Sequence, residues 1–171
     1  MKNNFSSYKV FWWIFLCVLV LDQLTKYLIQ LVQHTRSSEV FFSVWGWLSL
    51  VYVRNTGAAW GVMAGSGTVL GILAILALLT IFVLRKALQI KRFPMQIAFG
   101  LLSAGIAGNM IDRLFLGYVV DFVDCDFNSW RFPAFNIADA GISIGVGIYI
   151  AFSLLEWIGQ QKKSAAVSVK E

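Results

Sequence analysis

The chain carries three short polar motifs among long apolar segments: GNMIDR at 108–113, VVDF at 119–122 and FNIAD at 135–139. They stand at or near the ends of segments that are apolar enough for lipid. Ionisable groups at membrane depth are costly, so they are retained mainly where they have partners and a function. The three motifs therefore predict a polar site at the place where several membrane helices end.

The composition excludes an ordinary soluble domain. Hydrophobic residues make up 58% of the 171 residues and charged residues 13%, whereas soluble domains have about 45–50% and about 25%. The apolar residues gather in long runs, as helices that cross a bilayer require. We therefore predict an integral membrane protein that forms a single domain over residues 1–171.

Four segments are long and apolar enough to span a membrane, since a spanning helix needs about 20 mostly apolar residues. They predict an all-α membrane bundle of four helices, at residues 10–32, 68–88, 95–116 and 137–158. The connections at 33–67 and 117–135 lie on one side, and a tail follows at 161–171. Basic residues flank the spans on the other side, and this bias predicts that both termini are cytoplasmic; they are Lys2, Lys9, Arg85, Lys86, Lys91, Arg92, Lys162, Lys163 and Lys170.

The charge and the ligand-type residues limit the partners. The net charge is +5, but the basic residues flank apolar segments and form no polar module, so we predict no nucleic-acid partner. Cys17 lies inside the first apolar run and Cys125 in a polar connection, so we expect no disulfide framework. With His34 as the sole histidine, the chain lacks the usual ligands of zinc and other transition metals. We predict neither a metal nor another cofactor.

The connection at 33–67 is long enough for structure of its own. Residues 41–53 are rich in valine and aromatic residues, with Trp45-Gly46-Trp47 as a break, and Asn55-Thr56-Gly57 is typical of a turn. This pattern predicts short strands or an interfacial segment rather than a fifth span. The connection at 117–135 is short, polar and acidic, and we predict a loop there.

Depth in the membrane predicts which polar groups meet. A helix rises about 1.5 Å per residue, which places the polar residues of three helices near the same outer face: Asp22, Lys26, Asn109, Asp112, Arg113, Asn136 and Asp139. Such a site would be reached from outside or sideways from the lipid, whereas a transporter would distribute polar groups through the midplane. A small ion-coupled transporter and a non-catalytic assembly subunit remain the alternatives.

Most of these residues also have a purely structural interpretation. Asp22 and Lys26 form an i,i+4 pair in the favourable acid-first order. Asn136 and Asp139 fit an N-cap with a capping box. Asp112 could form an ion pair with its neighbour Arg113. The glycines of the last two spans more simply permit close helix packing than phosphate binding; they are Gly100, Gly105, Gly108, Gly141 and Gly145.

Asp121 has no such structural interpretation, because it stands between Val120 and Phe122 with no cation next to it in sequence. If it meets Asp139, the two carboxylates cannot both ionise readily and would share one proton. This is the arrangement of aspartic proteases, in which the carboxylate activates water and the acid donates a proton. The physics makes this pairing possible but does not require it.

Two other hydrolytic arrangements are less well supported by the residues. A serine triad is disfavoured because His34 is the sole histidine and lies outside any suitable motif. A Ser–Lys dyad could use Lys26, but Asp22 already offers that lysine a partner.

Five motifs together resemble the bacterial lipoprotein signal peptidases (signal peptidase II). They are DQLTK at 22–26, NTGAA at 55–59, GNMIDR at 108–113, VVDF at 119–122 and FNIAD at 135–139. The resemblance covers most of the chain, and its departures are mild: Trp60 stands where phenylalanine is common, and Ala104 where many members have glycine.

The resemblance implies an aspartic endopeptidase of the bacterial inner membrane that cuts diacylglyceryl-modified prolipoproteins just before the lipidated cysteine. It implies that Asp121 and Asp139 are the catalytic pair. Supporting roles carry over to Asn55, Asn109, Arg113 and Asn136, with Asp22 and Lys26 as a structural or site-supporting pair. The family also implies an extracytoplasmic β-like cradle, an interfacial helix, an active site near the outer face, contact with membrane lipids, and inhibition by the cyclic peptide globomycin.

Overall fold

A computed structural model describes residues 8–35, 40–44, 46–57, 63–127 and 130–168, and within them the chain forms four helices and four strands. In chain order they are α1 (Lys9–Thr35), β1 (Val40–Val44), β2 (Leu48–Asn55), α2 (Gly67–Leu84), α3 (Phe93–Phe115), β3 (Val119–Asp126), β4 (Arg131–Phe135) and α4 (Ile137–Ser168). Each helix is long and apolar enough to cross a membrane, over Ile137–Lys162 in the case of α4. The four predicted spans are therefore confirmed.

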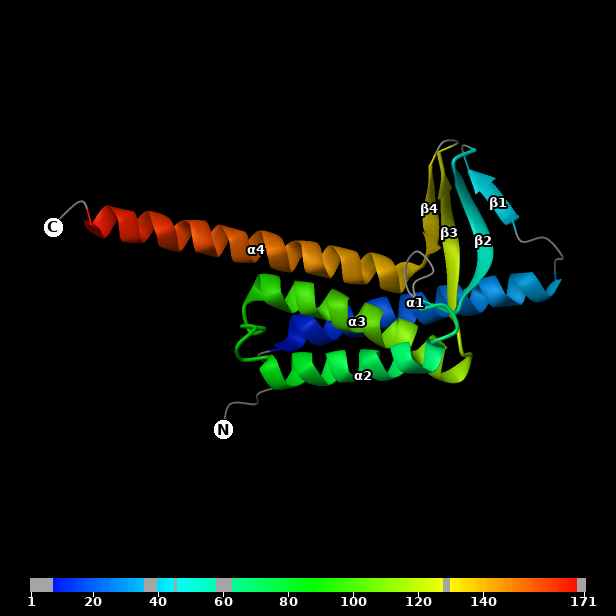
Figure 1. Cartoon of the computed structure of the whole chain (residues 1–171), viewed down its shortest axis with the longest axis horizontal. Coiled ribbons are helices and arrows are strands. Elements are labelled where there is room, and N and C mark those ends of the chain that lie inside the picture. The colour runs from blue at the N-terminus through cyan, green and yellow to red at the C-terminus, as the bar shows by residue number, and fades with distance from the viewer. Residues whose placement is uncertain (1–7, 36–39, 45, 58–62, 128–129, 169–171) are drawn as a thin grey trace.

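The helices lie side by side, and the sheet stands at the end of the bundle where α1 and α3 end and α2 and α4 begin (Figure 1). The strands run across the helix axes rather than along them (Figure 1). Helix α3 is central, because it packs against each of the other three helices and is the most buried of the four. Its polar end meets the sheet, which brings GNMIDR, VVDF and FNIAD to one place.

Glycines allow α3 and α4 to approach closely. A Cβ atom on Gly145 would lie 2.6 Å from the backbone oxygen of Ala98, and one on Gly105 would collide with the backbone oxygen of Ala138. Both distances are shorter than atoms can tolerate, so only glycine fits. The prediction that these glycines serve helix packing is confirmed.

The sheet is antiparallel with the order β1-β2-β3-β4. The strands expected within 41–53 are confirmed, with Gly46 at a φ of +73° in the turn between β1 and β2. The connection at 117–135 was predicted only as a loop, but β3 and β4 form there. The sequence did not reveal β3 because its aspartates Asp121 and Asp124 are buried with partners. The strand therefore lacks the regular alternation of buried apolar and exposed polar residues.

An all-α description is therefore too narrow, since a small antiparallel sheet completes the bundle. The described residues of the connection between α1 and α2 form strands and turns. The expected interfacial helix is not among them, and residues 58–62 lie outside the described part. Asn55 forms the predicted turn, because its Oδ1 accepts a hydrogen bond of 3.0 Å from the Gly57 backbone nitrogen.

Two helix ends differ from the predicted spans. Helix α2 ends at Leu84 rather than near residue 88, and α4 continues to Ser168, ten residues beyond the predicted end. Hydropathy marks the part of a helix that lies in lipid, whereas residues such as glutamine, lysine and alanine extend the helix into water.

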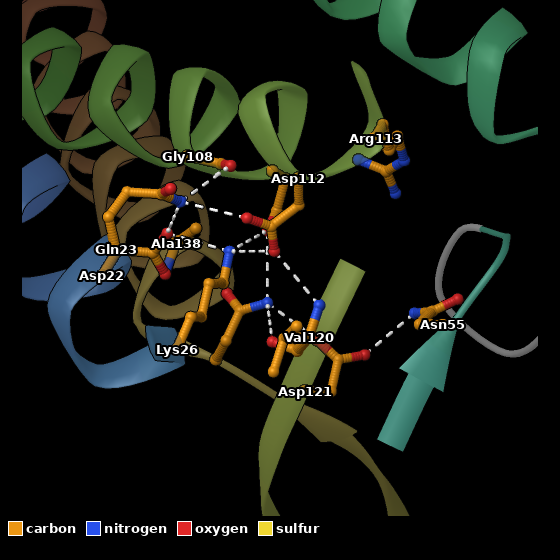
Figure 2. A network of polar contacts seen from close by, with 12 residues as sticks. Asp22, Gln23, Lys26, Asn55, Gly108, Asp112, Arg113, Val120, Asp121 and Ala138 are labelled. Atoms are coloured by element: carbon orange, nitrogen blue, oxygen red, sulfur yellow. Dashed lines mark hydrogen bonds and ion pairs between the residues drawn. The ribbon is translucent and has the colours of Figure 1, made fainter. Parts of the chain in front are cut away.

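A buried charge network attaches α1 to α3 (Figure 2). Lys26 is 1% exposed, and its Nζ lies 2.8 Å from Asp22 Oδ2 and 3.1 Å from Asp112 Oδ2. The same Nζ donates to Asn109 Oδ1 at 2.9 Å. The predicted Asp22–Lys26 pair is confirmed. The sequence suggested that Asp112 could pair with its neighbour Arg113. Instead, Asp112 pairs with Lys26 of the other helix.

The network also reaches α4 and β3. Asp22 Oδ1 accepts a hydrogen bond of 2.9 Å from the Ala138 backbone nitrogen in the first turn of α4. Asp112 Oδ2 accepts one of 3.1 Å from the Val120 backbone nitrogen in β3. A buried carboxylate is stable only with such donors, so the start of α4 is held against α1 and the start of β3 against the end of α3.

We expect Lys26→Met to destabilise the protein by about 3–5 kcal/mol, because it leaves buried carboxylates without their cation. Arg92→Gln is the control, since Arg92 pairs with Glu156 at the surface and such pairs contribute about 0–1 kcal/mol. Thermal unfolding in detergent measures both. Equal losses of stability in the two variants would contradict the importance of the buried network.

We expect Gly145→Ala to destabilise the contact between α3 and α4 by about 1–3 kcal/mol, the usual range for overpacking. Gly147→Ala is the matched control two residues away, where a Cβ would meet no atom within 4 Å. That variant should be neutral or more stable, because alanine favours a helix over glycine by about 1 kcal/mol. If thermal unfolding ranks the two variants in the opposite order, the close packing assigned to Gly145 is wrong.

Candidate active site

A cavity of about 790 Å³ lies where β2, β3 and β4 meet the ends of α3 and α4. One part of its lining is polar, with Asn55, Asn109, Arg113, Asp121 and Asp139. Another part is apolar and includes Val53, Phe132, Phe135, Ile142 and Ile144. Five of the eight predicted site residues thus line one cavity, which is suited to a molecule with both a polar group and an apolar portion.

Asp121 comes from the middle of β3, where it pairs in register with Val53 of β2. Its carboxylate is 2% exposed and accepts two hydrogen bonds from asparagine side chains. Asn55 Nδ2 donates to Oδ2 at 3.0 Å (Figure 2), and Asn136 Nδ2 donates to Oδ1 at 2.7 Å. The strand and the two asparagines therefore hold this carboxylate in one orientation.

Asp139 lies in the first turn of α4 and completes the predicted capping box. Its Oδ2 accepts a hydrogen bond of 3.1 Å from the Asn136 backbone nitrogen, and its own backbone nitrogen donates to Asn136 Oδ1 at 2.9 Å. The structural interpretation of this pair is confirmed, but it is incomplete. Asn109 Nδ2 of α3 donates to Asp139 Oδ1 at 2.7 Å, and Asp139 lines the cavity.

Asn136 lies between the two aspartates and contacts both. Its Nδ2 donates to Asp121 Oδ1, and also to Asn109 Oδ1 at 3.2 Å and to the Val120 oxygen at 3.3 Å. Its Oδ1 accepts from the backbone of Asp139. The side chain is 1% exposed, so it forms a rigid spacer that brings the carboxylates to one site.

The carboxyl of Asp121 is unusually prone to hold a proton. Burial raises the pKa of Asp121 from its ordinary value of 3.8 to about 7, and the negative charge of Asp139 contributes to the increase. The hydrogen bonds from Asn55 and Asn136 favour the ionised form and oppose this increase in pKa. Asp121 is therefore able to hold a proton near neutral pH.

Arg113, like Arg54, places a positive charge on the cavity lining. Its Nη2 donates to the Gly57 oxygen at 2.9 Å, which attaches the end of α3 to the turn after β2. Its Nε is buried and has no hydrogen-bond partner among the residues that the structure describes. Arg113 lines the cavity, so its guanidinium places a positive charge beside a bound molecule.

The structure separates Asp22 and Lys26 from the cavity, which they do not line. They support it from behind, because Lys26 binds Asn109 and Asn109 binds Asp139. A Ser–Lys dyad using Lys26 does not fit this placement, since two carboxylates and an amide oxygen surround the ammonium. His34 lies in the last turn of α1 and does not line this cavity either.

Sequence reasoning missed the roles of Asp112 and Gln23. Gln23 Nε2 donates to Asp112 Oδ1 at 3.1 Å and to the Gly108 oxygen at 3.2 Å (Figure 2). The available signal was the position of a glutamine next to Asp22 in an apolar helix. Within the part of the chain that the structure describes, no group of three His, Cys, Asp or Glu side chains is arranged to hold a metal ion.

Comparison with known proteins gives consistent matches over most of the chain. The family model described as signal peptidase (SPase) II matches residues 14–155. The lipoprotein signal peptidases of Staphylococcus aureus strains JH9 and Newman are each 40% identical to this chain over 147 residues, which make up 85% of this chain and 88% of each relative.

Solved structures agree with the sequence matches. Two solved structures are each described as a bacterial membrane enzyme structure obtained by the in meso method, at resolutions of 2.3 Å and 1.9 Å. Each is 37% identical in sequence to this chain and covers 85% of it. Their TM-scores are 0.74 and 0.71, and this chain covers 87% and 92% of them. With a family model that spans most of its length and relatives that are 40% identical over 147 of its residues, the chain belongs to the signal peptidase II family.

Proposed function

We propose that Asp121 and Asp139 are the catalytic pair with which this chain cleaves peptide bonds. As a member of the signal peptidase II family, the chain is a membrane-embedded aspartic protease that removes signal peptides from prolipoproteins. One observation supports the assignment to these two residues: both carboxyl groups line the same cavity, and Asn136 donates to both of them, through its side-chain Nδ2 to Asp121 and through its backbone nitrogen to Asp139.

The carboxyl groups divide the chemistry between them. Asp139 stands in the first turn of α4, where the helix dipole favours a negative charge. It removes a proton from a water molecule whose oxygen attacks the carbonyl carbon of the scissile bond. Asp121, whose pKa of about 7 keeps it protonated near neutral pH, donates a proton as the carbon–nitrogen bond breaks and the amine leaves.

The lining of the cavity fits a substrate that is partly peptide and partly lipid. Arg113 and Asn55 line the polar part, where a peptide backbone offers carbonyl acceptors. Phe132, Phe135 and Ile144 provide an apolar surface for acyl chains. The substrate is accordingly a prolipoprotein whose cysteine carries diacylglycerol, cut just before that cysteine after sideways entry from the bilayer.

The proposed setting is the inner membrane of a bacterium. The basic residues that flank the spans place both termini in the cytoplasm, which puts the sheet and the cavity at the outer face. Cyclic peptides of the globomycin type would inhibit the enzyme by occupying the same cavity, and lipids would surround the exposed apolar faces of the helices.

Asp121→Asn and Asp139→Asn should each reduce cleavage by roughly 10⁴-fold, the scale on which loss of a catalytic group acts. Asp124→Asn is the matched control: it makes the same change on the same strand, at a residue that pairs with Arg131 and does not line the cavity. The measurement uses purified protein in detergent, a diacylglyceryl-modified prolipoprotein peptide and its unlipidated twin.

The wild type should cut only the lipidated peptide, before the cysteine, and the control should retain activity. Substantial activity in both Asp121→Asn and Asp139→Asn, with folding verified by thermal unfolding, would show that the reacting groups lie elsewhere.

The stability of the protein should depend on pH through Asp121. In the folded protein this carboxyl holds its proton up to about pH 7, whereas its ordinary pKa is 3.8. Between these values the folded state binds more protons than the unfolded state, so stability falls as pH rises from about 4 to about 7. Thermal unfolding at pH 5 and pH 8 should show a larger loss in the wild type than in Asp121→Asn. The same loss in both proteins would contradict the increase in pKa.

A further inference from the structure

A second cavity, of about 460 Å³, lies on the other side of β2, against the last turns of α1. Its lining residues are Gln30, Gln33, His34, Thr35, Tyr52, Arg54 and Tyr118. None of these described residues carries a carboxylate, and Arg54 contributes a fixed positive charge. We infer that this cavity binds the phosphate of a membrane phospholipid at the headgroup level.

The cation in this cavity is held in place by aromatic residues. Arg54 Nε donates to the Tyr52 hydroxyl at 3.2 Å, and the guanidinium carbon lies 5.5 Å from the Tyr52 ring centre and 5.2 Å from that of Tyr118. The guanidinium thus donates through Nε to Tyr52, while its two Nη groups have no hydrogen-bond partner among the residues that the structure describes. A guanidinium presented in this way suits the paired oxygens of a phosphate.

Hydroxyl groups add donors next to the guanidinium. The hydroxyls of Tyr52 and Tyr118 lie 3.2 Å apart. Burial raises the pKa of Tyr118 above its ordinary value, so its hydroxyl stays protonated. One of the two hydroxyls donates to the other, which leaves one hydroxyl proton of the pair for a bound molecule. On the opposite wall, Gln33 Oε1 is buried without a partner among the described residues. It can accept a hydrogen bond from a hydroxyl or amine of a lipid headgroup.

The position along α1 favours a lipid over a soluble anion. Tyr27, Leu28 and Leu31 are exposed along α1 just before the cavity, and Gln33, His34 and Thr35 follow in its last turns. This change from exposed apolar to polar residues is expected where a spanning helix leaves the hydrocarbon for the headgroups. The acyl chains of a phospholipid could therefore lie along Leu28 and Leu31 while its phosphate meets Arg54.

The site is adjacent to the active site but distinct from it. Arg54 borders both cavities, and Asn55 next to it holds Asp121. A lipid bound to Arg54 would thus contact the strand that orients a reacting carboxyl. The inference concerns binding and does not depend on peptidase activity.

The test is a native mass spectrometry titration of the full chain, delipidated in detergent, with dioleoylphosphatidylglycerol. Two partial probes are titrated in parallel. Dioleoylglycerol has the same acyl chains but no phosphate, and inorganic phosphate has no acyl chains. We expect the phospholipid to bind and both partial probes to bind far more weakly. Arg54→Gln should weaken phospholipid binding by about tenfold or more, the effect of losing a charged hydrogen bond.

Two further variants make the result specific. Tyr118→Phe removes only a hydroxyl and should also weaken binding, which guards against misfolding of Arg54→Gln. Arg131→Gln removes an exposed arginine of the same sheet, paired with Asp124 and outside both cavities, and should bind as the wild type does. Binding should persist in Asp139→Asn, so this test and the test of catalysis can fail separately.

Equal phospholipid binding by wild type and Arg54→Gln would overturn the inference. So would equal binding of dioleoylglycerol, which would show that only the acyl chains matter. Displacement by inorganic phosphate at equal concentration would overturn it in favour of a site for a soluble anion. Tighter binding of an acidic peptide than of the phospholipid would overturn it in favour of a peptide site.

Discussion

The buried ammonium of Lys26 is the constraint on which the arrangement of the site depends. A charge inside an apolar bundle is tolerated only when carboxylates and hydrogen-bond acceptors surround it. Here Asp22, Asp112 and the side-chain oxygen of Asn109 do so. Because the two carboxylates also accept backbone N–H groups of α4 and β3, a single ion network sets the positions of four elements.

The same network decides which way the asparagines of the active site point. Lysine is a donor only, so Asn109 must present its oxygen to Lys26, which leaves its Nδ2 for Asp139. Asn136 similarly uses its Nδ2 toward Asp121 and its oxygen toward the backbone of Asp139. Asp139 in turn combines two roles, because the same carboxylate closes the capping box of α4 and lines the cavity. Residues that do not touch the cavity thus control the hydrogen bonds of the carboxyl groups that line it.

Features encoded by neighbouring residues follow from the sequence alone. Four apolar runs specify four spans, the spacing of Asp22 and Lys26 specifies their pair, and Asn136 with Asp139 specifies a cap. The pair and the cap depend on contacts within a few residues of one helix, and the spans depend on the transfer of one apolar segment from water to lipid. Neighbouring residues are therefore sufficient to specify them. The motifs also indicate Asp121 and Asp139 as the candidate pair of reacting groups.

Other features depend on contacts between residues far apart in the chain. Strands β3 and β4 were concealed because the carboxylates of β3 are buried with partners from other elements. The sequence left open an ion pair between Asp112 and its neighbour Arg113, but a helix directs adjacent side chains apart, and Asp112 pairs with Lys26 of α1 instead. The separation of the two aspartates by Asn136, and the second cavity behind β2, likewise arise only when the sheet packs on the end of the bundle.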